Sequence, residues 1–125
     1  GREMIKQKKG SIINISSVSS FIANRPQKQC HYNSSKAGVN ILTKCLAVEW
    51  APYNIRVNAI APGYVATPLL KEADEKLLKE WASLAPTKRI AEPYEFKGVC
   101  VFLASRASSY ITGSVIVVDG GYTTW

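Results

Sequence analysis

Short runs of β-branched residues alternate along this chain with longer stretches of helical character, and this alternation constrains the fold more than any other feature. The runs cover residues 11–17, 54–61 and 114–119, and each is bordered by glycine or proline. Such borders are typical of short strands. Strands that alternate with helices pair in parallel through right-handed crossovers. We therefore expect an α/β fold with about three strands and with helices on both faces of the sheet.

Three of the intervening stretches are predicted to be helices. The clearest covers residues 32–50, where apolar side chains recur at helical spacing at Ile41, Leu42, Cys45, Leu46 and Val48. A charged helix is expected over residues 68–84 with Trp81 on its apolar side, and a third opens at Glu92 or Pro93.

The first ten residues end like the last turn of a helix, with Gly10 where a left-handed cap is common. A helix this short is not stable alone, so we expect the chain to start within a longer element.

Composition fits one globular domain, residues 1–125, because 46% of the 125 residues are hydrophobic. The apolar runs are far shorter than the ~20 residues of a membrane helix, and no signal peptide is evident. Cys30, Cys45 and Cys100 are odd in number and lie inside what look like regular elements. They fit a reducing, cytoplasmic location better than a disulfide framework.

The net charge is +7, which permits binding to nucleic acid without requiring it. Aromatic residues do not interleave with the cations, and residues 71–80 mix both signs of charge. The cations therefore indicate solvated faces rather than a nucleic-acid footprint.

Tyr32 and Lys36 stand four residues apart at the start of the clearest helix, which puts the phenol and the ammonium group on one face. A nearby cation favours the phenolate form of a tyrosine and makes it useful for proton transfer. The pair alone is weak evidence, because the spacing is common. Two other polar segments support it. Ser16-Ser17 ends the first strand, and residues 62–67 follow the second, so both lie where open α/β sheets bind ligands.

Four motifs in order resemble the C-terminal half of the short-chain dehydrogenase/reductase family. They are Gly10-Ser-Ile-Ile-Asn-Ile-Ser-Ser17, Tyr32-x-x-x-Lys36, Ile55-Arg-Val-Asn-Ala-Ile-Ala-Pro-Gly63 and Tyr110-Ile-Thr-Gly-Ser-Val-Ile-Val-Val-Asp-Gly-Gly121. The resemblance implies that residues 1–125 are the C-terminal catalytic half of a single Rossmann-like dehydrogenase domain with a doubly wound parallel sheet, without its N-terminal dinucleotide-binding half. Asn24-Arg-Pro-Gln27 and the ending Asp119-Gly-Gly-Tyr-Thr-Thr-Trp125 look like the branch that interconverts polyols and ketoses such as sorbitol, mannitol, arabinitol and xylulose.

The resemblance also assigns roles. Ser17 matches the serine that orients the substrate oxygen, with Ser16 and Ser19 as alternatives. Tyr32 matches the general acid/base, and Lys36 matches the residue that favours its phenolate and binds the nicotinamide ribose. The segment that lines the nicotinamide of NAD or NADP is matched by Pro62, Gly63, Val65 and Thr67.

The family's glycine-rich dinucleotide motif, its Asn-Asn-Ala-Gly segment and its catalytic asparagine have no match in these residues. Two hypotheses follow. The parent protein is an oxidoreductase acting on a small alcohol or ketone as a homo-oligomer, dimer or tetramer, whereas the 125 residues alone are inactive. Alternatively, the chain is a non-catalytic fragment or truncated paralogue.

No metal site is expected, because His31 has no partner at ligand spacing. Cys30 is interpreted as an unreactive thiol.

Overall fold

The computed structural model describes residues 1–125, except for the side chain of Lys71. Its sheet has three parallel strands in the order β1 (Gly10–Ile15), β2 (Ile55–Pro62) and β3 (Val115–Val118). The register pairs Gly10 with Ile55 and Ala59 with Val115. The expected α/β fold with parallel strands is therefore confirmed.

Most of the helices lie where the sequence predicts them. They are α1 (Arg2–Gln7), α2 (Cys30–Trp50), α3 (Pro68–Lys71), α4 (Glu75–Leu84) and α5 (Lys97–Ala104). Short 3-10 turns connect them at η1 (Val18–Ser20), η2 (Ala51–Tyr53), η3 (Pro93–Phe96) and η4 (Arg106–Ser108).

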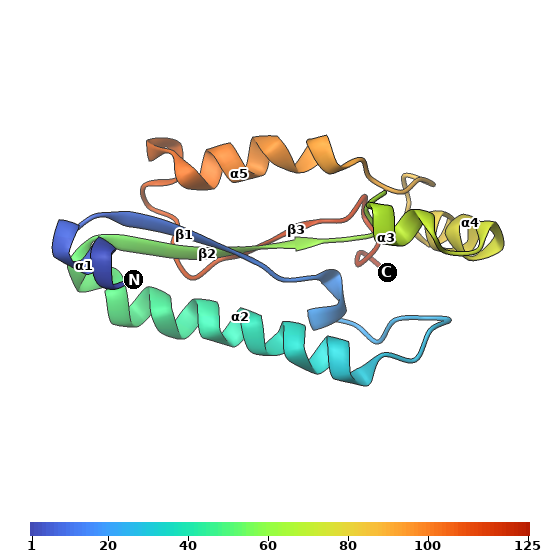
Figure 1. The fold of residues 1–125 in the computed structure, drawn as a ribbon, viewed down its shortest axis with the longest axis horizontal. Coiled ribbons are helices and arrows are strands. Elements are labelled where there is room, and N and C mark those ends of the chain that lie inside the picture. Colours follow the sequence, from blue (N-terminus) through green and yellow to red (C-terminus); the bar gives the residue numbers. More distant parts are fainter.

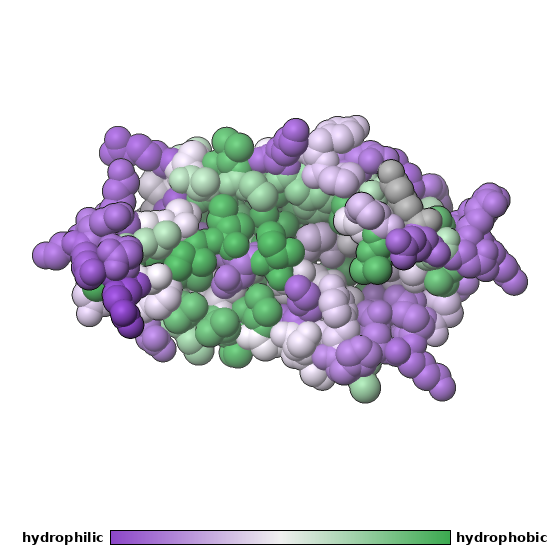
Figure 2. Space-filling model, viewed as in Figure 1, coloured by the Kyte–Doolittle hydropathy of each residue, from purple (hydrophilic) through white to green (hydrophobic). Residues whose placement is uncertain are grey.

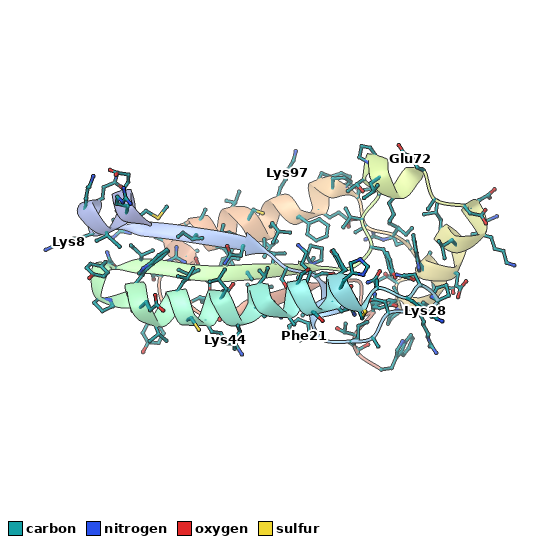
Figure 3. The ribbon with its side chains drawn as sticks, turned by 60° about the horizontal axis from the view of Figure 1, so that its bottom comes forward. Lys8, Phe21, Lys28, Lys44, Glu72 and Lys97 are labelled. Atoms are coloured by element: carbon teal, nitrogen blue, oxygen red, sulfur yellow. The ribbon has the colours of Figure 1, made fainter. Side chains whose placement is uncertain are left out.

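Three layers make up the molecule, with the sheet between α2 on one face and α5 on the other (Figure 1). In a second view, Lys44 of α2 and Lys97 at the start of α5 project to opposite sides (Figure 3). The central strand β2 is covered from both faces, and its residues Ile55, Val57 and Ile60 are at most 1% exposed. This burial fits the apolar residues that make up most of β2, because parallel strands are ordinarily covered on both faces.

Two polar side chains of β2, the buried Asn58 and the partly buried Arg56, join this strand to α5 and to the segment before β3. The Asn58 amide donates to the Ile111 carbonyl at 2.9 Å and accepts from the Ser114 N–H at 3.0 Å. The Arg56 guanidinium donates to the Leu103 carbonyl at 2.9 Å, among other oxygens. Since a buried polar group is stable only when it is hydrogen-bonded, these pairs fix the sheet from within.

Two details of the sequence-based prediction are wrong. Residues 68–84 form two helices rather than one, because Asp74 accepts a hydrogen bond from the Lys76 N–H at 3.2 Å and starts α4 afresh. The left-handed residue after α1 is Lys8, at φ 50°, whereas Gly10 already begins β1.

Strand β1 forms one edge of the sheet, and apolar side chains are exposed around it. Figure 2 shows them gathered over the middle of the view, between α2 and α5. The exposed fraction is 54% for Ile15, 60% for Ile41 of α2 and 67% for Val101 of α5. Among the helices that the structure describes, none is long and apolar enough to cross a membrane.

Candidate active site

A cavity of about 550 Å³ opens at the carboxyl ends of β1 and β2. Its wall comes from the segment after β1, the first turns of α2, the turn after β2, and helices α3 and α4. The seven residues singled out for catalysis or cofactor binding all line it: Ser17, Tyr32, Lys36, Pro62, Gly63, Val65 and Thr67. Positions up to 50 residues apart in sequence thus meet at one site.

Tyr32 and Lys36 lie one turn apart on α2, as their spacing predicts. The Lys36 Nζ atom is 5.7 Å from the centroid of the Tyr32 ring and donates to the Ile15 carbonyl at 2.9 Å. This bond to the last residue of β1 holds the ammonium group beside the phenol. Tyr32 is 39% exposed, so its hydroxyl is accessible from the cavity.

The two serines after β1 differ in what their hydroxyls do. The Ser16 hydroxyl donates to Asn40 Oδ1 at 2.5 Å, which ties the end of β1 to α2. The Ser17 Oγ atom accepts from the Ser19 N–H at 3.1 Å, and its own proton has no acceptor among the described residues. Of these two serines, Ser17 has a hydrogen-bond donor left for a ligand. The third candidate, Ser19, also lines the cavity; its Oγ atom accepts from Gln29 Nε2 at 3.2 Å, and its proton likewise has no acceptor among the described residues.

The turn after β2 exposes backbone groups to the cavity. A Cβ atom on Gly63 would lie 2.9 Å from the Asp119 Cα atom, so only glycine allows this close approach. Farther along, the Thr67 hydroxyl caps α3 by accepting from the Leu70 N–H at 3.3 Å. The Val65 N–H has no acceptor within the described part of the chain, although Val65 lines the cavity.

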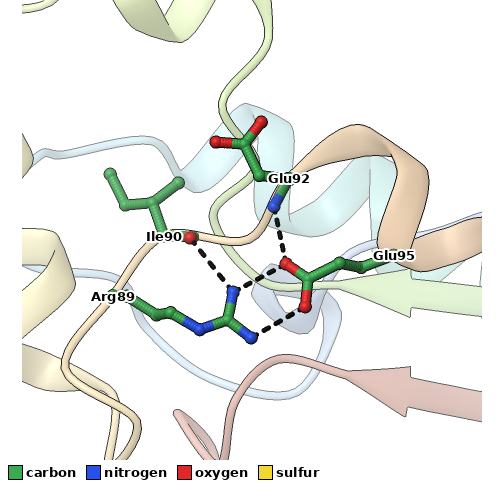
Figure 4. Close-up of polar contacts among 4 residues, drawn as sticks. All are labelled: Arg89, Ile90, Glu92 and Glu95. Atoms are coloured by element: carbon green, nitrogen blue, oxygen red, sulfur yellow. Dashed lines mark hydrogen bonds and ion pairs between the residues drawn. The ribbon is translucent and has the colours of Figure 1, made fainter.

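An ion pair braces the segment that packs against this turn (Figure 4). The Arg89 guanidinium donates to both carboxylate oxygens of Glu95, at 2.6 and 2.7 Å. These bonds, together with one from the Glu92 N–H, lower the pKa of Glu95 to about 2. Next to the pair, Ala91 forms an isolated bridge with Val65, so the ion pair supports the turn from outside.

The sequence does not predict a hydrogen-bond network that joins Gln27, Tyr64 and Trp81 in the wall of the cavity. The Trp81 indole N–H donates to Gln27 Oε1 at 3.0 Å, and Gln27 Nε2 donates to the Tyr64 hydroxyl at 2.7 Å. The Tyr64 and Trp81 rings stack with centroids 4.6 Å apart. Only the apolar face of the helix around Trp81 pointed to this network in the sequence, because its members come from separate segments. Burial is the main cause that raises the pKa of the adjacent Tyr122 to about 12, and interaction with Tyr64 is the second.

Cys30 and His31 are both exposed at the start of α2. No group of three or more metal-ligating side chains occurs among the residues described.

Comparison with known proteins identifies the family. A family model described as enoyl-(acyl carrier protein) reductase matches residues 1–123. The chain belongs to the short-chain dehydrogenase/reductase family.

Two curated relatives act on polyols. D-arabinitol 2-dehydrogenase (ribulose-forming) of Candida albicans is 55% identical over 120 residues, which cover 93% of this chain and 43% of the relative. Galactitol 2-dehydrogenase (L-tagatose-forming) of Cereibacter sphaeroides is 46% identical, over 100% of this chain and 50% of the relative. The expected resemblance to the polyol and ketose branch is confirmed. The chain spans about half the length of these relatives.

Solved structures share the fold. A gluconate 5-dehydrogenase from Burkholderia cenocepacia, in complex with NADP and tartrate, has a TM-score of 0.90 at 37% identity and matches 99% of this chain and 49% of its own. A 3-oxoacyl-(acyl-carrier protein) reductase from Brucella melitensis with bound NAD has a TM-score of 0.88 at 37% identity, over 98% of this chain and 44% of its own. The observed sheet is thus the Rossmann-like half predicted from the motifs.

Proposed function

We propose that the full-length protein is an NAD(P)-dependent oxidoreductase that interconverts a polyol and a ketose, with Tyr32 as the general acid/base. The observation that carries the proposal is the convergence of Tyr32, Lys36 and Ser17 on one cavity. The polyol dehydrogenases among the relatives support the substrate class.

The residues suit the proton transfer that this reaction requires. In the oxidation of an alcohol, the Tyr32 oxygen accepts the proton of the substrate hydroxyl, and in the reverse reaction it returns that proton to the ketone oxygen. The ammonium group of Lys36 lies 5.7 Å from the ring centroid, beside the phenol that would exchange the proton. The free proton of the Ser17 hydroxyl donates to the same substrate oxygen and orients it.

The residues at the turn after β2 fit a nicotinamide. The Val65 N–H lacks an acceptor among the described residues and lines the cavity, so it suits the oxygen of a carboxamide. Pro62, Gly63 and Thr67 would border the ring, and Lys36 would bind the ribose hydroxyls. When bound, the nicotinamide supplies the donor or the acceptor of hydride. Relatives with NAD and with NADP are both known, so we propose a nicotinamide cofactor without assigning its form.

The proposal is tested with Tyr32→Phe in the full-length protein. The variant keeps the ring and loses the acid/base hydroxyl, so we expect turnover of sugar alcohols with NAD or NADP to fall at least about 1,000-fold. Thermal unfolding should be unchanged, because Tyr32 is 39% exposed and its hydroxyl makes no bond within the described residues. Retention of most activity at every pH would refute the role of Tyr32. A full-length wild-type protein without any nicotinamide-dependent turnover would favour the non-catalytic alternative.

A homo-oligomer, dimer or tetramer, is also proposed for the full-length protein. The exposed apolar positions of α2 support it: Ile41 is 60%, Leu42 50% and Val48 76% exposed.

A further inference from the structure

Gln27 lines the same cavity as Tyr32 and Ser17, yet the proposed proton transfer does not use its amide. Gln27 lies in the segment between η1 and α2 and is partly buried. Apolar side chains line the cavity nearby, among them Leu70 and Leu77. A polar group with a fixed orientation in such a wall can distinguish substrates by their hydroxyl groups.

Two hydrogen bonds fix the orientation of this amide. The Trp81 indole is a donor only, so the amide atom that faces it, at 3.0 Å, must be the oxygen. The amide nitrogen therefore faces the Tyr64 hydroxyl, at 2.7 Å. Trp81 is 8% exposed and stacked on Tyr64, so neither partner moves freely. Rotation of the amide would break both bonds at once.

Half of the hydrogen-bonding capacity of the amide is left over. A primary amide has two N–H donors and two acceptor lone pairs, and one of each is used. Within the described residues, no partner takes the second N–H or the second lone pair. One donor beside one acceptor complements an alcohol hydroxyl, which also donates once and accepts.

We propose that Gln27 is a specificity-determining residue that binds a hydroxyl group of a polyhydroxylated substrate, at a carbon other than the reacting one. This inference rests on the proposed function and deepens it, because it names the group that would favour a sugar alcohol over a simple secondary alcohol. The Tyr64 and Trp81 side chains act as positioning residues for the amide.

The test compares two substrates in the full-length protein. Wild type and Gln27→Met are assayed with a five-carbon sugar alcohol and with 2-pentanol, which has one hydroxyl. Loss of a hydrogen bond between neutral groups should lower kcat/KM for the sugar alcohol about tenfold. The value for 2-pentanol should stay within about twofold of wild type, because that substrate has no second hydroxyl to lose. Gln7→Met, the same change on the exposed face of α1, should leave both values unchanged.

A conservative variant separates hydrogen bonding from packing. Gln27→Glu keeps the length and the acceptor for the Trp81 indole, and it can accept from a substrate hydroxyl, so it should retain most of the preference for the sugar alcohol. If Gln27→Met does not fold, Gln27→Asn replaces it, since it withdraws the amide by one methylene group and should show the same selective loss.

Two outcomes overturn the inference while leaving the proposed function intact. One is an equal loss for both substrates, which would mean that Gln27 only supports the cavity wall. The other is an unchanged preference in Gln27→Met. Failure of the proposed function has a different signature, because the wild-type protein would then oxidise neither alcohol.

Discussion

At the scale of single residues, Ser16 and Ser17 offer a matched pair of substitutions. Ser17→Ala removes the donor that we propose orients the substrate oxygen, so kcat should fall about 100-fold while the unfolding free energy changes little. Ser16→Ala should instead destabilise the protein by about 1–3 kcal/mol, because the Asn40 carbonyl oxygen loses its donor. Steady-state kinetics and urea unfolding of both variants measure the split. If kcat falls more in Ser16→Ala than in Ser17→Ala, Ser16 rather than Ser17 is the serine that orients the substrate.

A second residue-scale prediction concerns pH and Glu95. Its pKa in the folded protein is about 2, below the ordinary value of 4.5, because it pairs with Arg89. The pairing therefore stabilises the fold fully above about pH 4.5, and this contribution is lost as the pH falls toward 2. The side chain of Glu95 is 28% exposed and that of Arg89 is 56% exposed, so solvent screens the pair and the effect on stability is small.

The measurement is the urea midpoint of the full-length protein and of Glu95→Gln between pH 7 and pH 2. The midpoints should differ at neutral pH and converge at the acid end. Glu75→Gln breaks a more exposed ion pair, with Lys79 Nζ at 2.7 Å from Glu75, and should show a smaller difference throughout. A gap between wild type and Glu95→Gln that does not depend on pH would contradict the assignment.

Residue identities could be predicted from the sequence where the relevant geometry is local. Tyr32 and Lys36 meet because a helix places positions four apart on one face. Ser17 and Val65 follow strands whose carboxyl ends share one edge of the sheet. The contacts among Gln27, Tyr64 and Trp81 could not be predicted, because they join three segments whose relative positions only tertiary packing determines.

At the scale of elements, the segment that covers the cavity depends on the start of α4. The sequence predicts one charged helix over residues 68–84 that opens at Pro68. The Asp74 side chain caps a new helix within this range, and a side-chain cap competes with helix continuation. The break at Asp74 lets α4 run in a different direction from α3, and in this arrangement the Trp81 ring of α4 stacks on Tyr64.

Loss of this cap should loosen α4. Asp74→Ala removes the acceptor for the Lys76 N–H and should cost about 1 kcal/mol locally. Hydrogen exchange of Glu75–Leu84 in the full-length protein should become about fivefold faster, while α2 remains unchanged. Glu75→Ala, one residue farther along, is the control because its side chain does not cap the helix. Equal exchange rates in Asp74→Ala and wild type would show that packing of Trp81 alone holds α4.

At the scale of the whole molecule, the sheet has an open edge at β1 with apolar surface on both sides of it. Strand β1 pairs with β2 only, so the groups on its other side have no strand partner in the described residues. Parallel strands are ordinarily covered on both faces and rarely exposed at an apolar edge. Ile15 of β1, Ile41 of α2 and Val101 of α5 are each more than half exposed. Figure 2 shows apolar side chains gathered between α2 and α5 on this side of the molecule.

The 125-residue polypeptide produced by itself should therefore aggregate or associate through non-native contacts, because a contiguous apolar patch and an unpaired strand edge both promote association. Sedimentation velocity over a range of concentrations measures this directly. Ile41→Lys combined with Val101→Lys places two charges at exposed apolar positions of α2 and α5 and should shift the distribution toward monomer, whereas Lys44→Arg, on the outer face of α2, should not. A wild-type polypeptide that sediments as a monomer and unfolds cooperatively would instead show that these residues form a self-sufficient domain, whose core around β2 is stable without further strands.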